Sequence, residues 1–249
     1  MAESINPEMC VMLPNPFPDY ISFCLLSVHS TLNQNLHPAE ENYLSLVSSP
    51  SRKQQYRSGR ICAKEALSRL GIKDQPVLRD SDTREPIWPE NISGAITHSG
   101  NWVAAATGRT TTVSGIGIDL EDMKRNIDPG ISRHVCIREE NEWLKELDDL
   151  YVDQALKLIF SAKESIFKAF FPSTRIFLHF HDARIFLEDS IFQSSKPESF
   201  PNEKQKSQSR VIEFEYLILN REVIRQTGKS RGKGKAQFFE SYVLTSVYY

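Results

Sequence analysis

Two segments of the sequence combine carboxylates and a lysine in patterns that suit phosphoryl chemistry. The first, GIGIDLE, is an apolar stretch that ends with Asp119 and Glu121. Side chains at positions i and i+2 leave a strand on the same face, so these two carboxylates can converge on one cation. The second, FSAKESIFK, predicts a helix that presents Glu164 and Lys168 on one face, at positions i and i+4. Three carboxylates and an ammonium favour a hard divalent metal bound together with phosphate oxygens.

Each segment, taken alone, also has an ordinary structural interpretation. Asp119 and Glu121 are typical of a solvated loop after a strand, and Glu164 with Lys168 is typical of a surface ion pair on a helix. The presence of both segments in this order favours the chemical interpretation.

Both motifs resemble the signature of the 4'-phosphopantetheinyl transferases, in the siderophore-synthase class of enterobactin synthase component D and in the surfactin-synthase type. That family's pattern is roughly G-[IV]-D-x-E followed by [WF]-[ST]-x-K-E-[AS]-x-x-K, and the chain fits it at every defined position. The resemblance extends upstream to PIWP at residues 86–89 and to GAITHS at residues 94–99, where the family has G-S-[IL]-[ST]-H-[ST]. It covers roughly residues 40–172.

The resemblance implies a reaction. The 4'-phosphopantetheine group of coenzyme A moves to a serine of an apo acyl or peptidyl carrier protein, and adenosine 3',5'-bisphosphate is released. The implied cofactor is Mg²⁺, with Mn²⁺ as a substitute, and its implied ligands are Asp119, Glu121 and Glu164. Glu164 is expected to take the serine proton and Lys168 to hold a phosphate. Siderophore synthases or other secondary-metabolite synthases are the expected clients.

The resemblance also implies which residues bind coenzyme A. Arg52 and Arg60 lie eight residues apart on a predicted helix, can point the same way, and are expected at the nucleotide end, including its 3'-phosphate. Without the resemblance, they would also suit a solvated basic face. The sequence departs from the family at Ala95, where a serine is usual, and at TREP (83–86), where Gly-[KR]-x-Pro is commonest. The predicted set is Arg52, Arg60, Arg84, Glu85, Pro86, Thr97, His98, Asp119, Glu164 and Lys168.

Docking of the carrier protein is expected in the segment after the catalytic helix. Carrier domains are acidic helical bundles, so a receptor surface should offer apolar and basic side chains. By resemblance, these are Phe171, Arg175 and Phe177.

The implied fold is α+β and duplicated, with two pseudo-symmetric halves and the active site between them. Residues 1–110 are expected to contact the nucleotide, and residues 111–249 to carry the metal site, the catalytic helix and the docking surface. An internal echo supports a duplication, because AKEALSR begins at Ala63 and AKESIFK begins at Ala162, ninety-nine residues later.

Local patterns predict the elements that position these residues. Helices are expected at about 51–70, closed by Gly71, at 132–149, and at 153–170, stopped by Pro172. Strand-forming residues predict strands at 20–28, 93–97, 102–107, 113–120, 176–180, 211–216 and 241–245.

Composition sets further bounds. A chain of 249 residues with 40% hydrophobic and 25% charged residues can bury a sizeable core, as one large domain or two halves. A net charge of -2 gives no indication of a nucleic-acid partner. No apolar run reaches the length of a membrane span, and the four cysteines lack metal spacing. Reduced thiols in a cytoplasmic protein are therefore expected. The protein is also expected to be a monomer.

Two other functions fit parts of the pattern. A metal-dependent phosphohydrolase of a nucleotide diphosphate can also use D-x-E with a distant glutamate. A non-catalytic carrier-binding module could retain the fold, although the presence of Asp119, Glu121, Glu164 and Lys168 argues against decay of the site.

Overall fold

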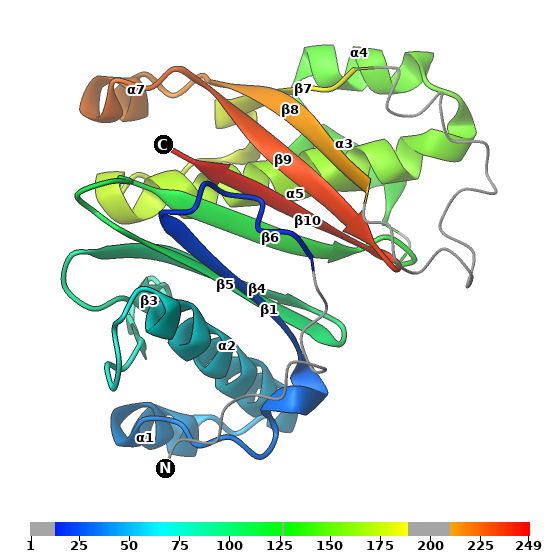
Figure 1. Cartoon of the computed structure of the whole chain (residues 1–249). Helices are drawn as coiled ribbons and strands as arrows, with labels where there is room; N and C mark the ends of the chain where they lie inside the picture. Colours follow the sequence, from blue (N-terminus) through cyan, green and yellow to red (C-terminus); the bar gives the residue numbers. More distant parts are fainter. Residues whose placement is uncertain (1–12, 126, 189–209) are drawn as a thin grey trace. The chain divides into compact units, whose positions relative to one another are not determined.

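The computed structural model of the chain describes residues 13–125, 127–188 and 210–249. The chain divides into two compact units, Met1–Ser114 and Gly115–Tyr249, and each combines one long helix with an antiparallel sheet (Figure 1). The predicted α+β class is therefore confirmed. Within the described ranges, no helix is both long enough and apolar enough to cross a bilayer.

The first unit is a three-stranded antiparallel sheet covered by a long helix. Its strands, β1 (Ile21–Ser27), β4 (Ile92–Ser99) and β5 (Trp102–Arg109), lie in the order β1-β5-β4. Helix α2 (Pro50–Arg69) packs against β5 and β1. The smaller elements are the 3-10 helix η2 (Val28–Thr31), α1 (Pro38–Leu46), and the two-residue strands β2 (Leu78–Arg79) and β3 (Pro86–Ile87).

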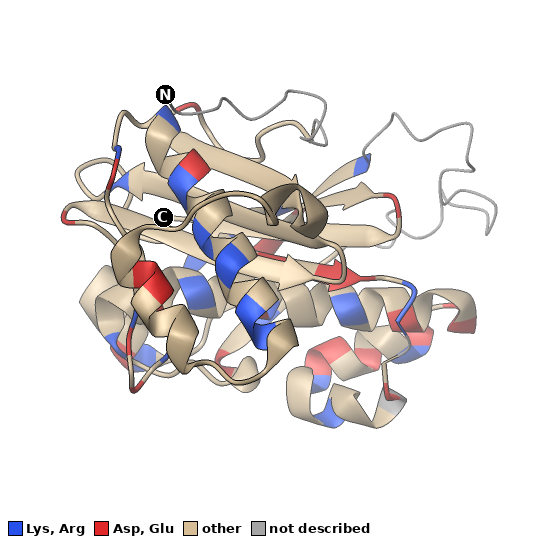
Figure 2. Cartoon of the chain, turned by 90° about the horizontal axis from the view of Figure 1, so that it is seen from below, with Lys and Arg blue, Asp and Glu red and all other residues tan. Residues whose placement is uncertain are grey.

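Capping residues explain where α2 begins and ends, and apolar side chains explain which of its residues are buried. Ser49 accepts a hydrogen bond from the backbone of Arg52, and Pro50 occupies the first turn, as is typical of a helix start. Gly71, at φ 78°, follows the last turn. Buried side chains such as Ile61 and Leu67 contribute about 1.5–3 kcal/mol each by leaving water. Basic residues follow one another along the same helix (Figure 2).

The second unit is a five-stranded antiparallel sheet against helix α5 (Asp149–Thr174), which contacts β6 and β10. The strand order is β6-β10-β9-β8-β7. These strands are β6 (Ile116–Asp122), β7 (Ala183–Phe186), β8 (Arg210–Ile218), β9 (Arg231–Phe239) and β10 (Tyr242–Tyr248). The remaining elements are η3 (Pro129–Ile131), α3 (Ser132–Val135), α4 (Arg138–Glu146), η4 (Phe180–Asp182) and α7 (Arg221–Thr227).

The two units share one connectivity. In each, the first strand is followed by helices and pairs antiparallel with the last strand, which pairs with the strand before it. In the first unit these strands are β1, β5 and β4, and in the second they are β6, β10 and β9.

Three predicted elements differ from the structure. The single helix expected over 132–149 is wrong, because Cys136 and Ile137 are extended and separate α3 from α4. The strand expected over 176–180 is also wrong, because Asp182 accepts a hydrogen bond from the His179 backbone and closes a turn before β7. Helix α5 passes through Pro172, because a proline in the last turn removes only one late backbone hydrogen bond.

The cysteines that the structure describes fit the expected thiol chemistry. Cys24, Cys62 and Cys136 are free and buried, as predicted. Cys10 lies outside the described residues.

Candidate active site

Asp119 is the best-anchored of the predicted site residues. It lies on β6 with 5% of its surface exposed. Its Oδ1 accepts a hydrogen bond from Lys168 Nζ at 2.6 Å, and its Oδ2 accepts one from Ser161 Oγ at 2.9 Å. Because Ser161 and Lys168 are seven residues apart, about two turns, one face of α5 supplies both donors.

A glycine lets β6 approach α5 this closely. A Cβ built on Gly117 would lie 1.8 Å from the Ser165 carbonyl oxygen and 2.8 Å from the Ala169 nitrogen. No side chain fits at that contact. The glycine two residues before Asp119 therefore serves the close packing that brings this carboxylate to α5.

A network of buried hydroxyl groups holds Ser161, the residue that donates a hydrogen bond to Asp119. The Thr245 Oγ1 lies 2.8 Å from Ser161 Oγ and 2.6 Å from Ser165 Oγ, and all three side chains are buried. Thr245 is also the strand partner of Asp119 in the pairing of β10 with β6. Ser161 belongs to the recognised motif, but no role was predicted for it, and nothing in the sequence around Thr245 indicates one.

Glu121 and Glu164 are partly buried carboxylates whose ionisation Asp119 disfavours. Burial, followed by the negative charge of Asp119, raises the pKa of Glu121 to about 7. Burial also raises the pKa of Glu164; Lys168 opposes this rise and Asp119 adds to it. The charge of Glu164 also contributes to the raised pKa of Glu121. The three carboxylates are therefore near enough to repel one another.

The donor set suits a hard cation, although the side chains are not gathered as ligands. In the part of the chain that the structure describes, no three or more His, Cys, Asp or Glu side chains form a group that could hold a metal. Mg²⁺ nevertheless binds oxygen ligands, and a cation bound here would relieve the repulsion among the carboxylates. Asp119, Glu121 and Glu164 fit such a group by type and charge, and their role as ligands stays a prediction.

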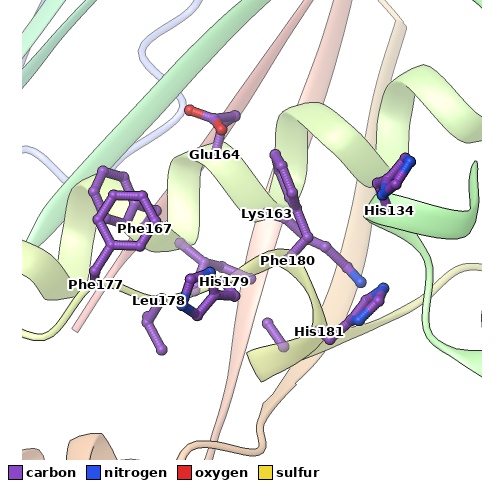
Figure 3. A pocket seen from close by; sticks show the side chains of 11 residues that line it. His134, Lys163, Glu164, Phe167, Phe177, Leu178, His179, Phe180 and His181 are labelled. Carbon is purple, nitrogen blue, oxygen red and sulfur yellow. The ribbon is translucent and has the colours of Figure 1, made fainter. Parts of the chain in front are cut away.

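A cavity of about 520 Å³ lies beside Glu164 in the second unit. Figure 3 shows Glu164 and Phe167 on α5, with Phe177 and His179 contributed by the segment that follows the helix. Phe167 packs against Phe177 and Phe171, at centroid distances of 5.0 and 5.1 Å. A cavity lined by aromatic side chains and by the histidines His134, His179 and His181 thus adjoins the predicted base.

The first unit holds a second cavity, of about 700 Å³, which collects most of the predicted coenzyme A residues. It is lined by Arg52, Arg60, Arg84, Pro86 and His98. Arg52 and His98 are exposed there, whereas Arg60 is only 6% exposed.

Glu85 and Thr97 are predicted residues outside the described lining of this cavity. Thr97 is 5% exposed, and strand alternation on β4 places its side chain on the face opposite Ile96 and His98. The cavity lining also includes residues that were not predicted, among them Tyr43, Tyr56 and Arg79.

The turn between β2 and β3 shapes one wall of this cavity. Asp80 Oδ1 accepts backbone hydrogen bonds from Asp82 and Thr83 at 2.9 and 2.8 Å, forming an Asx turn. Arg84 follows in the left-handed region, at φ 66°, which is unusual for a residue with a Cβ. The turn thereby presents the Arg84 side chain at the cavity.

Comparison with known proteins identifies the family. A model of the 4'-phosphopantetheinyl transferase N-terminal domain matches residues 40–108, and a model of the 4'-phosphopantetheinyl transferase superfamily matches residues 115–222. The second match contains Asp119, Glu121, Glu164 and Lys168.

Several curated proteins are similar to this chain. The 4'-phosphopantetheinyl transferase Npt of Nocardia iowensis is 36% identical over 154 residues, which are 61% of this chain and 66% of that protein. The 4'-phosphopantetheinyl transferase Svp of Streptomyces mobaraensis is 35% identical over 140 residues, 55% of each chain. Enterobactin synthase component D of Escherichia coli (strain K12) is 35% identical over 119 residues, 47% of this chain and 54% of that protein. The chain thus spans from 54% to 66% of the length of these relatives. With both family models matched in order, the resemblance predicted from the motifs is confirmed, and the chain belongs to the 4'-phosphopantetheinyl transferase superfamily.

Proposed function

We propose that this chain transfers the 4'-phosphopantetheine group of coenzyme A to a serine of an apo acyl or peptidyl carrier protein. The observation that carries the proposal is the buried carboxylate of Asp119, which accepts hydrogen bonds from Lys168 and Ser161. The negative charge of Asp119 contributes to the raised pKa values of Glu121 and Glu164. Burying such a charged cluster costs free energy, and carboxylates perturbed in this way are concentrated at functional sites.

In the proposed reaction, the serine Oγ bonds to the β-phosphorus of coenzyme A as the bond from that phosphorus to the bridging oxygen breaks. The serine proton passes to Glu164. Adenosine 3',5'-bisphosphate leaves with the bridging oxygen. The raised pKa of Glu164 brings its proton affinity closer to neutral pH, where a general base is most effective.

Asp119, Glu121 and Glu164 are the residues that would hold Mg²⁺ or, in its place, Mn²⁺. When bound, the metal would neutralise charge on the diphosphate. Lys168 supplies a further positive charge on the same face of α5 and suits a phosphate oxygen as a point charge. Ser161 holds Asp119 in place, so the carboxylate does not need to reorganise during the reaction.

The first unit is proposed to bind the nucleotide end of coenzyme A. Its cavity combines the side chains of Arg52, Arg60, Arg84 and His98 with the apolar surface of Pro86. Cationic and flat apolar groups together suit a phosphorylated nucleoside. The shared connectivity of the two units favours an origin by duplication into pseudo-symmetric halves.

For the carrier protein, we propose docking at the aromatic segment after α5. Phe177 is 62% exposed, and the Arg175 guanidinium carbon lies 5.7 Å from the Phe171 ring centroid. Exposed aromatic and basic groups suit an acidic helical partner. Relatives named enterobactin synthase component D favour a siderophore synthase or another secondary-metabolite synthase as the client. Three described free thiols favour the cytoplasm, and we expect a monomer.

A product analysis distinguishes this function from its rivals. The protein is incubated with Mg²⁺, coenzyme A and an apo carrier protein, and the products are separated by chromatography with mass detection. A transferase gives holo carrier and adenosine 3',5'-bisphosphate in equal amounts. A phosphohydrolase would release phosphopantetheine into water and leave the carrier in its apo form. A non-catalytic module would bind the carrier and leave coenzyme A intact.

A further inference from the structure

Thr245 lies at the centre of the buried hydroxyl groups next to Asp119. It is the partner of Asp119 in the pairing of β10 with β6, and directly opposed residues of such a pair present their side chains on the same face of the sheet. Ser161 and Ser165 are one turn apart on α5, and their Oγ atoms lie 2.8 and 2.6 Å from Thr245 Oγ1. All three hydroxyl-bearing side chains are fully buried. Thr245 therefore connects the sheet to the same helix that supplies both donors of Asp119.

The direction of these hydrogen bonds follows from the protons available, because each hydroxyl group has only one. Ser161 Oγ donates its proton to Oδ2 of Asp119 at 2.9 Å. In its contact with Thr245, Ser161 Oγ can then only accept, so Thr245 is the donor. Thr245 Oγ1 also lies 2.9 Å from the Ser161 carbonyl oxygen, so both acceptors of its proton belong to Ser161.

Ser165 supplies the first donor of the series. Its Oγ lies 2.6 Å from Thr245 Oγ1 and 3.2 Å from the Thr245 carbonyl oxygen. Because the proton of Thr245 is directed to Ser161, Ser165 donates in the shorter contact. The series therefore runs from Ser165 to Thr245, then to Ser161, and ends on Asp119, with every hydroxyl donating toward the carboxylate. Hydrogen bonds in such a series polarise one another, which strengthens the last one.

The two donors of Asp119 differ in how freely they can leave it. Lys168 donates to Oδ1 at 2.6 Å, but its side chain is 26% exposed and is assigned to a phosphate oxygen in the proposed reaction. Ser161 is fully buried, and Thr245 contacts both its Oγ and its carbonyl oxygen. A serine inside a helix otherwise competes by donating to a carbonyl of the preceding turn. Thr245 thus holds the Ser161 hydroxyl toward Asp119, whether or not Lys168 stays.

We propose that Thr245 is a positioning residue for the metal chemistry assigned to Asp119: acting through Ser161, it fixes the orientation of the carboxylate that would hold a divalent cation. This inference rests on the proposed function. Partners that orient a ligand side chain raise metal affinity, because the ligand is already in place when the metal binds. Thr245 needs no contact with substrate or metal for this role.

Binding of Mn²⁺ to the full chain without coenzyme A measures the effect, with the free ion followed by electron paramagnetic resonance. Thr245→Val keeps the shape of the side chain but removes its hydroxyl. It should raise the Mn²⁺ dissociation constant roughly 2- to 12-fold, the range for one net hydrogen bond. Thr245→Ser restores the hydroxyl and should recover most of the affinity. Thr107→Val is the matched control, because this buried threonine belongs to the first unit and its hydroxyl has no partner in the described part of the chain; the dissociation constant should stay unchanged.

The valine variant is expected to fold. Ser161 still has Asp119 as its acceptor, and Ser165 still has the carbonyl oxygen of residue 245, so neither serine is left without an acceptor for its proton. Urea unfolding checks this. Thr245→Ala, which removes the same hydroxyl without the valine methyl groups, is a second variant and should weaken Mn²⁺ binding in the same direction.

Ser161→Ala shows whether Thr245 acts through Ser161. This variant should weaken Mn²⁺ binding by itself, and Thr245→Val added to it should cause no further loss, because both changes interrupt one series of hydrogen bonds. In transfer assays, Thr245→Val should raise the Mg²⁺ concentration that gives the half-maximal rate, and saturating Mg²⁺ should restore a rate close to that of wild type.

Three results would decide against these assignments. Wild-type Mn²⁺ affinity in Thr245→Val, or the same loss in Thr245→Ser as in Thr245→Val, would overturn the positioning role of Thr245. Losses that add in the double variant would show that Thr245 does not act through Ser161. A wild-type protein that binds no Mn²⁺ would instead contradict the metal site of the proposed function.

Discussion

The ammonium of Lys168 lies 2.6 Å from Oδ1 of Asp119, and the Asp119 side chain is only 7% exposed. With Ser161 on Oδ2, both oxygens of this carboxylate have donors from one helix. A divalent cation bound at Asp119 would compete with Lys168 for the same negative charge. The ion pair therefore links the stability of the second unit to the proposed metal chemistry.

Asp119→Asn tests this link. The variant keeps the shape of the side chain but removes the carboxylate that pairs with the Lys168 ammonium at 2.6 Å, and only Glu121 and Glu164, whose pKa values are raised, remain as nearby counter-charges. Because Lys168 is 26% exposed and can partly reach water, we expect the free energy of unfolding to fall by about 1–3 kcal/mol. Transfer to the carrier should be lost. Urea unfolding and a transfer assay measure the two effects. Asp122→Asn, at the half-buried end of the same strand, keeps the side-chain oxygen that accepts the Lys124 N–H and should change stability by less than about 0.5 kcal/mol. Normal transfer by Asp119→Asn would contradict the site.

Glu121 should behave differently from Asp119 because its folded-state pKa is raised to about 7. Between the unfolded value near 4.3 and the folded value, the folded state binds more protons, so stability falls as pH rises through this window. Glu121→Gln removes the titrating carboxyl group, and with it this loss of stability at high pH. In the presence of a chelator, the variant should be more stable than wild type above about pH 7, by on the order of 1–2 kcal/mol after allowance for solvent screening.

Urea unfolding of both proteins from pH 5 to 8 checks this dependence. The stability difference should shrink as pH falls toward 5, and added Mg²⁺ should stabilise wild type more than the variant. A difference that is the same at pH 5 and pH 8 would show that Glu121 does not titrate as described.

Glu164→Gln separates binding from proton transfer. The amide keeps the size and one oxygen but cannot accept the serine proton. Proton transfer by a positioned side chain contributes typically 10²–10⁴-fold, so single-turnover transfer should fall by at least that factor. Calorimetry should still detect coenzyme A binding, because Arg52, His98 and Lys168 remain. Near-normal turnover would mean that another group is the base, and loss of all binding would make Glu164 chiefly a ligand.

Gly117→Ala tests the contact between β6 and α5. The new methyl group would overlap the Ser165 carbonyl, which is backbone and cannot move aside cheaply. We expect a loss of about 1–3 kcal/mol or more in the free energy of unfolding. Gly59→Ala is the contrast: its methyl group would meet only the Ile96 side chain, at 3.1 Å, and alanine favours a helix, so the net change should stay within about 1 kcal/mol. Equal effects of the two substitutions on thermal unfolding would contradict this account.

Much of the fold could be predicted from the sequence where the local signals are strong. Helix α2 has a capping serine, a first-turn proline and a closing glycine, and its predicted span is confirmed. The break at Cys136 and the turn at His179 depend on hydrogen bonds to Glu140 and Asp182. Capping bonds of this kind compete with helix and strand propensity, and the apolar pattern alone does not reveal them.

The candidate site could be predicted only where a motif carries it. Asp119 and Lys168 were predicted as site residues, and the structure brings them into contact. Thr245 lies far from any recognised motif and reaches its site only through the pairing of β10 with β6. Arg79 precedes the TREP segment (83–86) and lines the first-unit cavity only because β2 pairs with β3. Long-range pairing of this kind has no local signal.

The most direct test of the proposed function is the intact mass of an apo carrier protein after incubation with this protein, coenzyme A and Mg²⁺. A carrier whose modifiable serine is replaced by alanine, and a reaction containing a chelator, are run beside it. The account predicts one phosphopantetheine added to the wild-type carrier and none in either control. An unmodified wild-type carrier under conditions in which coenzyme A binds would contradict the proposed transferase activity, as would modification that survives the loss of the serine.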